Sequence, residues 1–80
     1  MVSIMVSVPP RQPKRPFESV AADLRARLEA GEWASGEALP AVGKLAESYG
    51  VSRATVARAL HTLADDGLVA IVPRWGVFRA

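Results

Sequence analysis

The amino-acid sequence predicts a mainly α-helical domain with a small β-hairpin near its C-terminal end, and three observations predict it. Two helical stretches are separated by a tight turn at Gly50. A third stretch with helical periodicity begins at Phe17. After Gly67, two short strand-like runs flank a group of turn residues. Three helices followed by a two-stranded hairpin form a winged helix-turn-helix, which is the predicted fold class.

Length and composition limit what this chain can be. Its 80 residues fit one domain, and half of them are hydrophobic, which is enough for a modest core. The absence of cysteine excludes disulfides and thiolate metal sites and is compatible with the cytoplasm, where we expect the protein to be. A net charge of +2 and a pI of about 9.7 give only a mild basic bias. Alone, that bias is a weak indication of nucleic-acid binding.

We expect residues 1–15 to form a flexible N-terminal tail with a proline-rich basic linker, and residues 16–80 to form the domain. Residues 1–8 are apolar but too short to span a bilayer, and no basic segment precedes them as in a signal peptide. They are interpreted as a tail, an incorrectly assigned start or a strand. Residues 9–16 contain four prolines and three positive charges. This extended linker is either a basic arm along phosphates or a soluble leader.

The first helix is predicted to start at Pro16 and to stop at Gly31. Arg25 and Arg27 are expected on its solvated face. Apolar residues recur at steps of three and four and define the inward face: Phe17, Val20, Ala21, Leu24 and Leu28.

The glycine-bounded connection that follows has two apolar anchors, Trp33 and Leu39, which we expect in the core. Ala38 and Leu39 are expected to form a very short strand. Pro40 then starts the second helix, predicted over residues 41–49.

The turn between the second and third helices carries recognisable stop and start signals. Gly50 can take the left-handed backbone that ends a helix. The Ser52 hydroxyl can cap the next helix by accepting a hydrogen bond from the amide of Ala54 or Thr55. These features predict a helix-turn-helix, whose second helix is suited to the DNA major groove.

Two further features support the same interpretation. Val51 and Val56 have the spacing of a hydrophobic staple, which orients the incoming chain. Ala46 is small enough to let the two helices approach closely. The alternative is an ordinary helical hairpin in a small bundle.

The third helix is predicted over residues 53–66, with Gly67 ending it. Its periodicity separates two faces. The inward stripe is Val56, Ala59, Leu60 and Leu63, and the outward side holds Arg53, Ala54, Ala57, Arg58 and His61. Residues 68–72 and 77–79 are the two predicted strands of the hairpin.

Two elements of the sequence form a distinctive pair of motifs: Gly36-Glu37-Ala38-Leu39-Pro40 and Gly50-Val51-Ser52-Arg53-Ala54-Thr55-Val56. With these motifs, residues 16–78 resemble the DNA-binding domain of GntR-type bacterial transcription regulators. The resemblance implies a repressor-like protein that binds double-stranded DNA at a short palindromic operator as a homodimer.

The resemblance also implies which residues meet DNA. Ser52 and Thr55 would touch phosphate, Arg53 would reach a base or a phosphate, and Gly76 would let the hairpin backbone approach the minor groove. The complete expected contact set is Lys44, Ser52, Arg53, Ala54, Thr55, Arg58, Arg74 and Gly76.

This chain departs from the family pattern at two positions expected to face DNA. Gly43 and Ala57 stand where the family often has arginine. Lys44 and Arg58 each follow by one residue and are rotated by about 100° around the helix. They are expected to reach phosphates without replacing the base contacts. Ala41 also stands where a serine usually caps the second helix. From these departures together we expect weaker DNA binding or recognition of different bases.

Family members usually continue into a C-terminal domain that binds a small-molecule effector and forms the dimer. The given sequence ends at Ala80. If it is the complete protein, we expect no effector site, and we expect dimerisation to come from the hairpin, the apolar N-terminal segment or the DNA, or not to occur.

The turn of the hairpin contains two residues with open interpretations. Arg74 is placed to reach the minor groove as a flexible cation, or is simply solvated. Trp75 either folds back on the core or packs on sugar and backbone, and we expect burial. His61 and Asp65 are four residues apart, but two ligands without a third do not make a metal site.

No nucleophile, base and orienting group can be assembled from this sequence, so we expect neither an enzyme nor a cofactor, and no membrane partner. Two functions remain. The first is a sequence-specific DNA-binding repressor. The second is a winged-helix protein-interaction module with lost DNA readout, suggested by Gly43 and Ala57.

Overall fold

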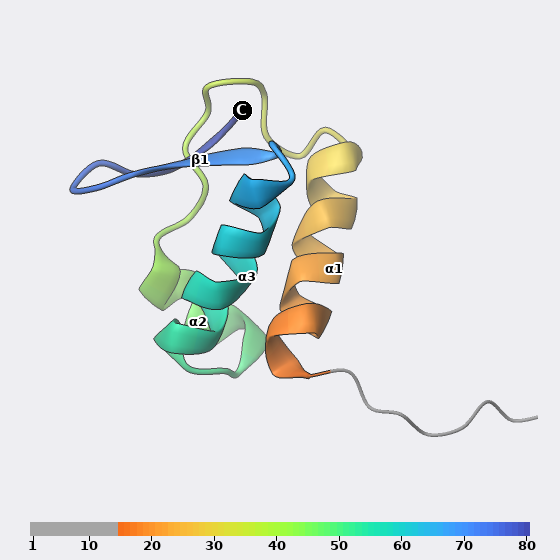
Figure 1. Ribbon diagram of the computed structural model, residues 1–80, viewed down its shortest axis with the longest axis vertical. Coiled ribbons are helices and arrows are strands. Elements are labelled where there is room, and N and C mark those ends of the chain that lie inside the picture. Colours follow the sequence, from red (N-terminus) through yellow and green to blue (C-terminus); the bar gives the residue numbers. More distant parts are fainter. Residues whose placement is uncertain (1–14) are drawn as a thin grey trace, which may run out of the picture.

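The computed structural model describes residues 15–80, and the expectations for the N-terminal segment and most of the linker lie outside these residues. Within them the order of elements is α1 (Pro16–Glu29), α2 (Val42–Tyr49), α3 (Arg53–Asp65), β1 (Val69–Val72) and β2 (Gly76–Arg79). Figure 1 shows α1 and α3 side by side, α2 at one end of this pair, and the hairpin across the other end. The predicted winged helix-turn-helix is confirmed.

The hairpin is antiparallel, with Val69 opposite Arg79 and Val72 opposite Gly76. The connection between α1 and α2 adds a short third segment to it, because Ala38 forms a bridge with Phe78. The Leu39 N–H donates to the Val77 carbonyl at 2.8 Å. The short strand expected at residues 38–39 is therefore present as one bridge.

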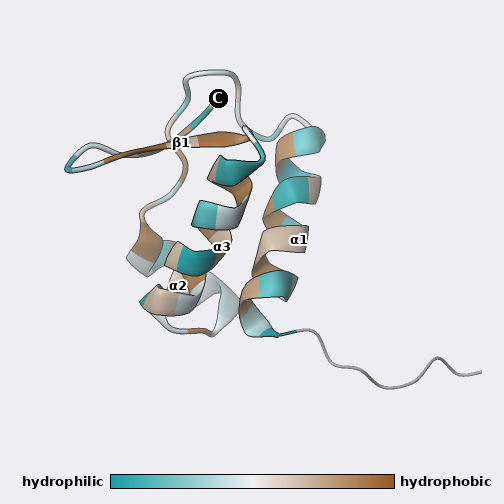
Figure 2. Cartoon of the chain, in the orientation of Figure 1, coloured by the Kyte–Doolittle hydropathy of each residue, from teal (hydrophilic) through white to brown (hydrophobic). Residues whose placement is uncertain are grey.

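One apolar core joins all five elements, and Figure 2 shows its residues as brown stretches on the facing sides of the helices. The inward stripes predicted for α1 and α3 are buried, apart from Phe17, which is half-buried. The expected core anchors Trp33 and Leu39 are buried as well. The buried residues are Val20, Ala21, Leu24, Leu28, Trp33, Leu39, Leu45, Ala46, Val56, Ala59, Leu60, Leu63, Val69 and Val77.

Some predicted helix boundaries are off by one residue. The second helix begins at Val42, because Ala41 has an extended backbone (φ −61°, ψ 152°) and takes the capping position. Ala41 provides no side-chain cap there. The third helix ends at Asp65, with Asp66 as its C-cap.

Arg25 and Arg27 lie on the solvent-facing side of α1 that the periodicity predicted, and both side chains also have tertiary partners there. Arg25 forms an ion pair with Asp66 at the end of α3. Arg27 donates to both carboxylate oxygens of Glu32 at 2.8 and 2.6 Å and lies over the Trp33 ring. Helical periodicity identified the polar face of α1 correctly. It could not show that the connection after α1 and the end of α3 would contact this face.

Arg27 also donates to the Tyr49 hydroxyl at 2.9 Å, and this hydroxyl donates in turn to the Asp23 carboxylate. Partial burial and then the Asp23 hydrogen bond raise the pKa of Tyr49. The Arg27 hydrogen bond lowers the pKa of Glu32. This network fixes the end of α2 against α1, which orients the helix-turn-helix.

Arg79 joins the hairpin to the end of α1. One of its nitrogens, Nη1, donates to the carbonyl oxygens of Leu28 and Trp33, at 2.8 Å each. The Leu28 carbonyl is among the last of α1, where no partner exists within the helix. No helix among residues 15–80 is both long and apolar enough to cross a membrane.

Candidate nucleic-acid interface

The turn before α3 has the geometry predicted from the sequence. Gly50 is left-handed (φ 67°, ψ 36°) and ends α2. The Val51 N–H then donates to the Ala46 carbonyl at 3.0 Å, and the Val51 side chain packs against the core. Because Val56 is fully buried beneath the first turn of α3, the start of this helix is supported from below.

The Ser52 cap is confirmed, with the amide of Thr55 as its donor. Ser52 Oγ accepts this hydrogen bond at 3.1 Å, and its hydroxyl donates to Thr55 Oγ1 at 3.0 Å. The remaining free amides of the first turn carry partial positive charge, which favours an anion such as phosphate. Both hydroxyls therefore lie at the end of α3 that a phosphate group would approach.

The structure brings most of the expected contact residues to one end of the helical pair, around the start of α3. Lys44, Ser52, Arg53, Ala54 and Arg58 are exposed, whereas Thr55 is half-buried. Ala57, expected on the outward side, is half-buried as well. Arg74 and Gly76 are exposed but lie apart from this group, in the hairpin turn.

Two open grooves flank the start of α3. The first, which we name the α2 groove, is lined by Ala41, Val42, Gly43, Lys44, Glu47 and Arg53. The second, named the α1 groove, is lined by Arg15, Pro16, Phe17, Ala54, Thr55 and Arg58. Glu47 is the one acidic residue that lines either groove. Together the two grooves are lined by four cationic side chains and one carboxylate.

Arg53 lies across the α2 groove, against Gly43. A Cβ added to Gly43 would stand 2.9 Å from Nη2, 3.2 Å from Cζ and 3.3 Å from Nε of Arg53. The guanidinium therefore rests on the bare α-carbon of Gly43, where a side chain would collide with it. Within residues 15–80, Arg53 has no ion pair or side-chain hydrogen bond, so its donors are available to a ligand.

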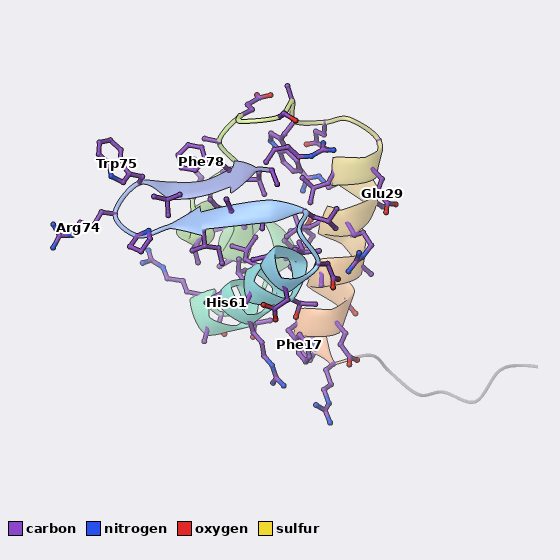
Figure 3. The ribbon with its side chains drawn as sticks, turned by 45° about the horizontal axis from the view of Figure 1, so that its top comes forward. Phe17, Glu29, His61, Arg74, Trp75 and Phe78 are labelled. Atoms are coloured by element: carbon purple, nitrogen blue, oxygen red, sulfur yellow. The ribbon has the colours of Figure 1, made fainter. Side chains whose placement is uncertain are left out.

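Arg58 is held at the opposite side of α3. Its guanidinium carbon lies 3.9 Å from the centre of the Phe17 ring, a cation–π contact. Figure 3 shows Phe17 at the N-terminal end of α1, beside α3. Sequence reasoning assigned Phe17 to the core and missed this contact. Arg15 lines the α1 groove; the sequence predicted it only as part of a basic arm over residues 9–16, as one of two alternatives, and not as a single contact residue.

The wing, residues 69–79, consists of β1, β2 and the turn between them. The turn is closed by the Trp75 N–H, which donates to the Val72 carbonyl at 3.0 Å. Arg74 has a positive φ of 72°, and Gly76 has a φ of 121°. A Cβ at Gly76 would meet nothing within 4 Å, so the backbone conformation, rather than lack of space, favours glycine there.

The predicted burial of Trp75 is wrong, because its side chain is 78% exposed. The turn lies beyond two strands of only four residues each, and the core reaches only Val69 and Val77 of the wing. Figure 3 shows Arg74 and Trp75 at the tip of the wing, directed away from the helices. An aromatic ring and a cation are thus displayed together.

His61 and Asp65 are both exposed on α3. Among residues 15–80 no group of three or more histidine, aspartate or glutamate side chains is arranged to hold a metal ion. The pair has no third ligand, and we assign it no site.

The family described as "Bacterial regulatory proteins, gntR family" matches residues 16–78. The chain belongs to the GntR family. Among curated relatives, the HTH-type transcriptional regulator TreR of Bacillus subtilis is 40% identical over 53 residues, which cover 66% of this chain and 22% of TreR. The histidine utilization repressor of Klebsiella aerogenes is 32% identical over 77 residues, covering 95% of this chain and 32% of the repressor. This GntR-family chain therefore spans a third or less of the length of these relatives.

Solved structures agree on the fold. The DNA-binding domain of AraR, in complex with operator ORE1, superposes with a TM-score of 0.85 at 22% identity, over 96% of this chain and 94% of that domain. A GntR family transcriptional regulator from Listeria monocytogenes gives a TM-score of 0.79 at 20% identity, over 86% of this chain and 60% of the regulator. The family and its members are transcription regulators and not enzymes, as expected from the sequence.

Proposed function

We propose that this GntR-family domain binds double-stranded DNA sequence-specifically, with the start of α3 in the major groove and the wing on the minor groove. One observation carries the proposal: the α3 start is capped, exposed and supported by the core, with cationic side chains on both sides. A helix presented in this way fits the width of the major groove.

Each expected contact residue has a role in this arrangement. Arg53 offers the planar fork of donors that matches guanine O6 and N7. Ser52 and Thr55 bind a phosphate at the helix start, and the short side chain of Ala54 allows close approach to the bases. Lys44 and Arg58 reach flanking phosphates. Arg74 enters the minor groove, and the backbone at Gly76 passes close to it.

We further propose that the protein is a repressor that occupies a promoter. Relatives support this role, since one of them is named a histidine utilization repressor. The AraR domain was crystallised with operator DNA, which supports a DNA partner for the same fold. Two copies on a palindromic operator would place their α3 helices about one helical turn apart, at a half-site separation of roughly 34 Å.

Selection of bound fragments from genomic DNA, followed by sequencing, tests the proposal and identifies the operator. A fluorescence titration of that duplex at increasing salt concentration then measures the phosphate contacts. Lys44 and Arg58, the two cations proposed to contact phosphates, predict a log K that falls by about 1.8 per tenfold rise in salt for each bound copy, at about 0.9 per phosphate. Arg53→Ala should relax the preference at the base pair that Arg53 reads, while the salt dependence largely persists.

The opposite result would favour the interaction module. If the protein bound no duplex even at low salt, the exposed surface around α3 would have to serve another partner. The family membership and the available donors of Arg53 favour DNA.

A further inference from the structure

The unusual contact at the interface is the one between Arg53 and Gly43, which joins the first residue of α3 to the second residue of α2. Three atoms of the guanidinium lie within 3.3 Å of the point where a Cβ of residue 43 would stand. Distances of 3.0 Å or less to a real Cβ are essentially never tolerated, and the shortest here is 2.9 Å. The present position of Arg53 therefore depends on the absence of a side chain at residue 43.

From this we infer that Gly43 is a specificity-determining residue, which acts by positioning the guanidinium of Arg53 for base readout. The inference rests on the proposed DNA binding and goes beyond it, since it assigns the readout to a pair of residues on two helices. Gly43 is a positioning residue, and Arg53 makes the contact.

The contact restricts an otherwise flexible side chain. A free arginine at the first position of a helix samples many rotamers, and ordering it on binding costs free energy. In the structure the fork lies against α2, and a guanidinium that keeps this position in the proposed complex needs less ordering on binding. Glu47 lines the same groove but forms no ion pair with Arg53. The position of the Arg53 guanidinium is therefore attributed to its contact with Gly43.

Replacement of Gly43 separates DNA readout from folding. The atoms that a new Cβ would meet belong to the far end of a flexible side chain, so Arg53 can move and the backbone need not. Gly43 lies inside α2, where its φ is not positive, and alanine is a better helix former than glycine. Gly43→Ala should therefore leave the thermal midpoint unchanged or higher while it displaces the guanidinium.

The test compares the parent with Gly43→Ala, Arg53→Ala and the double variant, each by selection of bound sequences and by affinity for the parent operator. We expect Gly43→Ala to lower discrimination about fivefold or more at the base pair that Arg53 reads. Arg53→Ala should relax the same base pair, and adding Gly43→Ala to it should have no further effect. Arg53→Lys keeps the positive charge but lacks the planar guanidinium. It should lose the preference at the same base pair and keep the salt dependence of binding.

Ser48→Ala is the matched control, since Ser48 is exposed on α2 and lines neither groove. It should leave both affinity and sequence preference unchanged. The inference is overturned if Gly43→Ala changes a base pair that Arg53→Ala does not, or if its effect persists undiminished in the Arg53→Ala background. It is also overturned if Gly43→Ala leaves the preference intact. A parent protein that binds DNA without any selectivity, or not at all, would instead refute the proposed function on which the inference rests.

Discussion

The two parts of the proposed interface, the start of α3 and the tip of the wing, are built in opposite ways. The start of α3 has a side-chain cap and stands on Val56, which is fully buried. The tip of the wing extends beyond the last core contact of each strand, and Ile71, Val72 and Trp75 are its exposed large hydrophobics. Figure 2 shows the hairpin projecting beyond the helices, with hydrophobic strands in brown and a hydrophilic turn in teal at its outer end.

This difference suits the start of α3 and the tip of the wing to different roles in the proposed DNA recognition. Base readout needs donors held in a fixed geometry, which is the role that we propose for the core and the Gly43 contact at Arg53. Contacts to the backbone and minor groove tolerate adjustment, because they follow the shape of DNA more than the identity of its bases. The wing has few core contacts and can make that adjustment. Substitutions in the two parts should therefore differ in kind as well as in size.

The largest expected effect comes from shortening a fully buried core side chain of α3. Leu63 is fully buried, and Leu63→Ala should lower the free energy of unfolding by about 2–5 kcal/mol through lost burial and a residual cavity. Urea denaturation followed by circular dichroism measures this loss. In a domain of 80 residues, it is a large fraction of the total stability.

Ile71→Ala is the matched control in the wing, where the side chain is 36% exposed. It should cost about 0.5 kcal/mol or less, as is usual for surface substitutions. Equal losses in the free energy of unfolding for Leu63→Ala and Ile71→Ala would show that the wing is packed as firmly as the helices, which would contradict the difference between the two parts.

A smaller effect is expected at the cap of α3. Ser52→Ala removes the acceptor of the Thr55 amide and should lower the free energy of unfolding by about 1 kcal/mol. DNA affinity should fall as well, because the same hydroxyl is proposed to meet a phosphate. Ser48→Ala, in the exposed part of α2, controls for the substitution itself. An unchanged stability for Ser52→Ala would mean that water replaces the cap without loss.

The same division between the two parts explains what could be predicted from the sequence. Helical periodicity, Gly50 and Ser52 are local signals, and they identified the helix-turn-helix and its cap correctly. Local signals could not show which residues, distant in sequence, would contact the arginines of α1. Arg25 meets Asp66, and Arg27 meets Tyr49, across 41 and 22 positions of the chain.

Trp75 was misplaced for a related reason. Large aromatic side chains are buried more often than not, and that tendency predicted burial. Its exposure depends on the lengths of β1 and β2 and on the distance between the core and the hairpin turn. No local sequence pattern indicates these two lengths. The Gly43–Arg53 contact could not be predicted from the sequence either. The sequence showed that residue 43 lacks the arginine common in the family, but not that the guanidinium of Arg53 lies beside it.

The smallest expected change in stability is at the wing tip itself, where Trp75→Ala should alter the free energy of unfolding by no more than about 0.5 kcal/mol. Its effect should instead appear in DNA binding. If the minor groove covers about 40 Å² of the indole, at about 25 cal/mol per Å², affinity should fall by about 1 kcal/mol, roughly fivefold. The fall should be similar for all sequences, because the wing follows groove shape.

Fluorescence can observe this contact directly, since the chain has two tryptophans in contrasting positions. Trp33 is 7% exposed and Trp75 is 78% exposed. In a Trp33→Phe variant all indole emission comes from Trp75, and iodide should quench it strongly in the free protein. Operator DNA should reduce this quenching if the ring enters the groove. Undiminished quenching in the saturated complex would show that the tip stays in solvent, and recognition would then rest on the start of α3 alone.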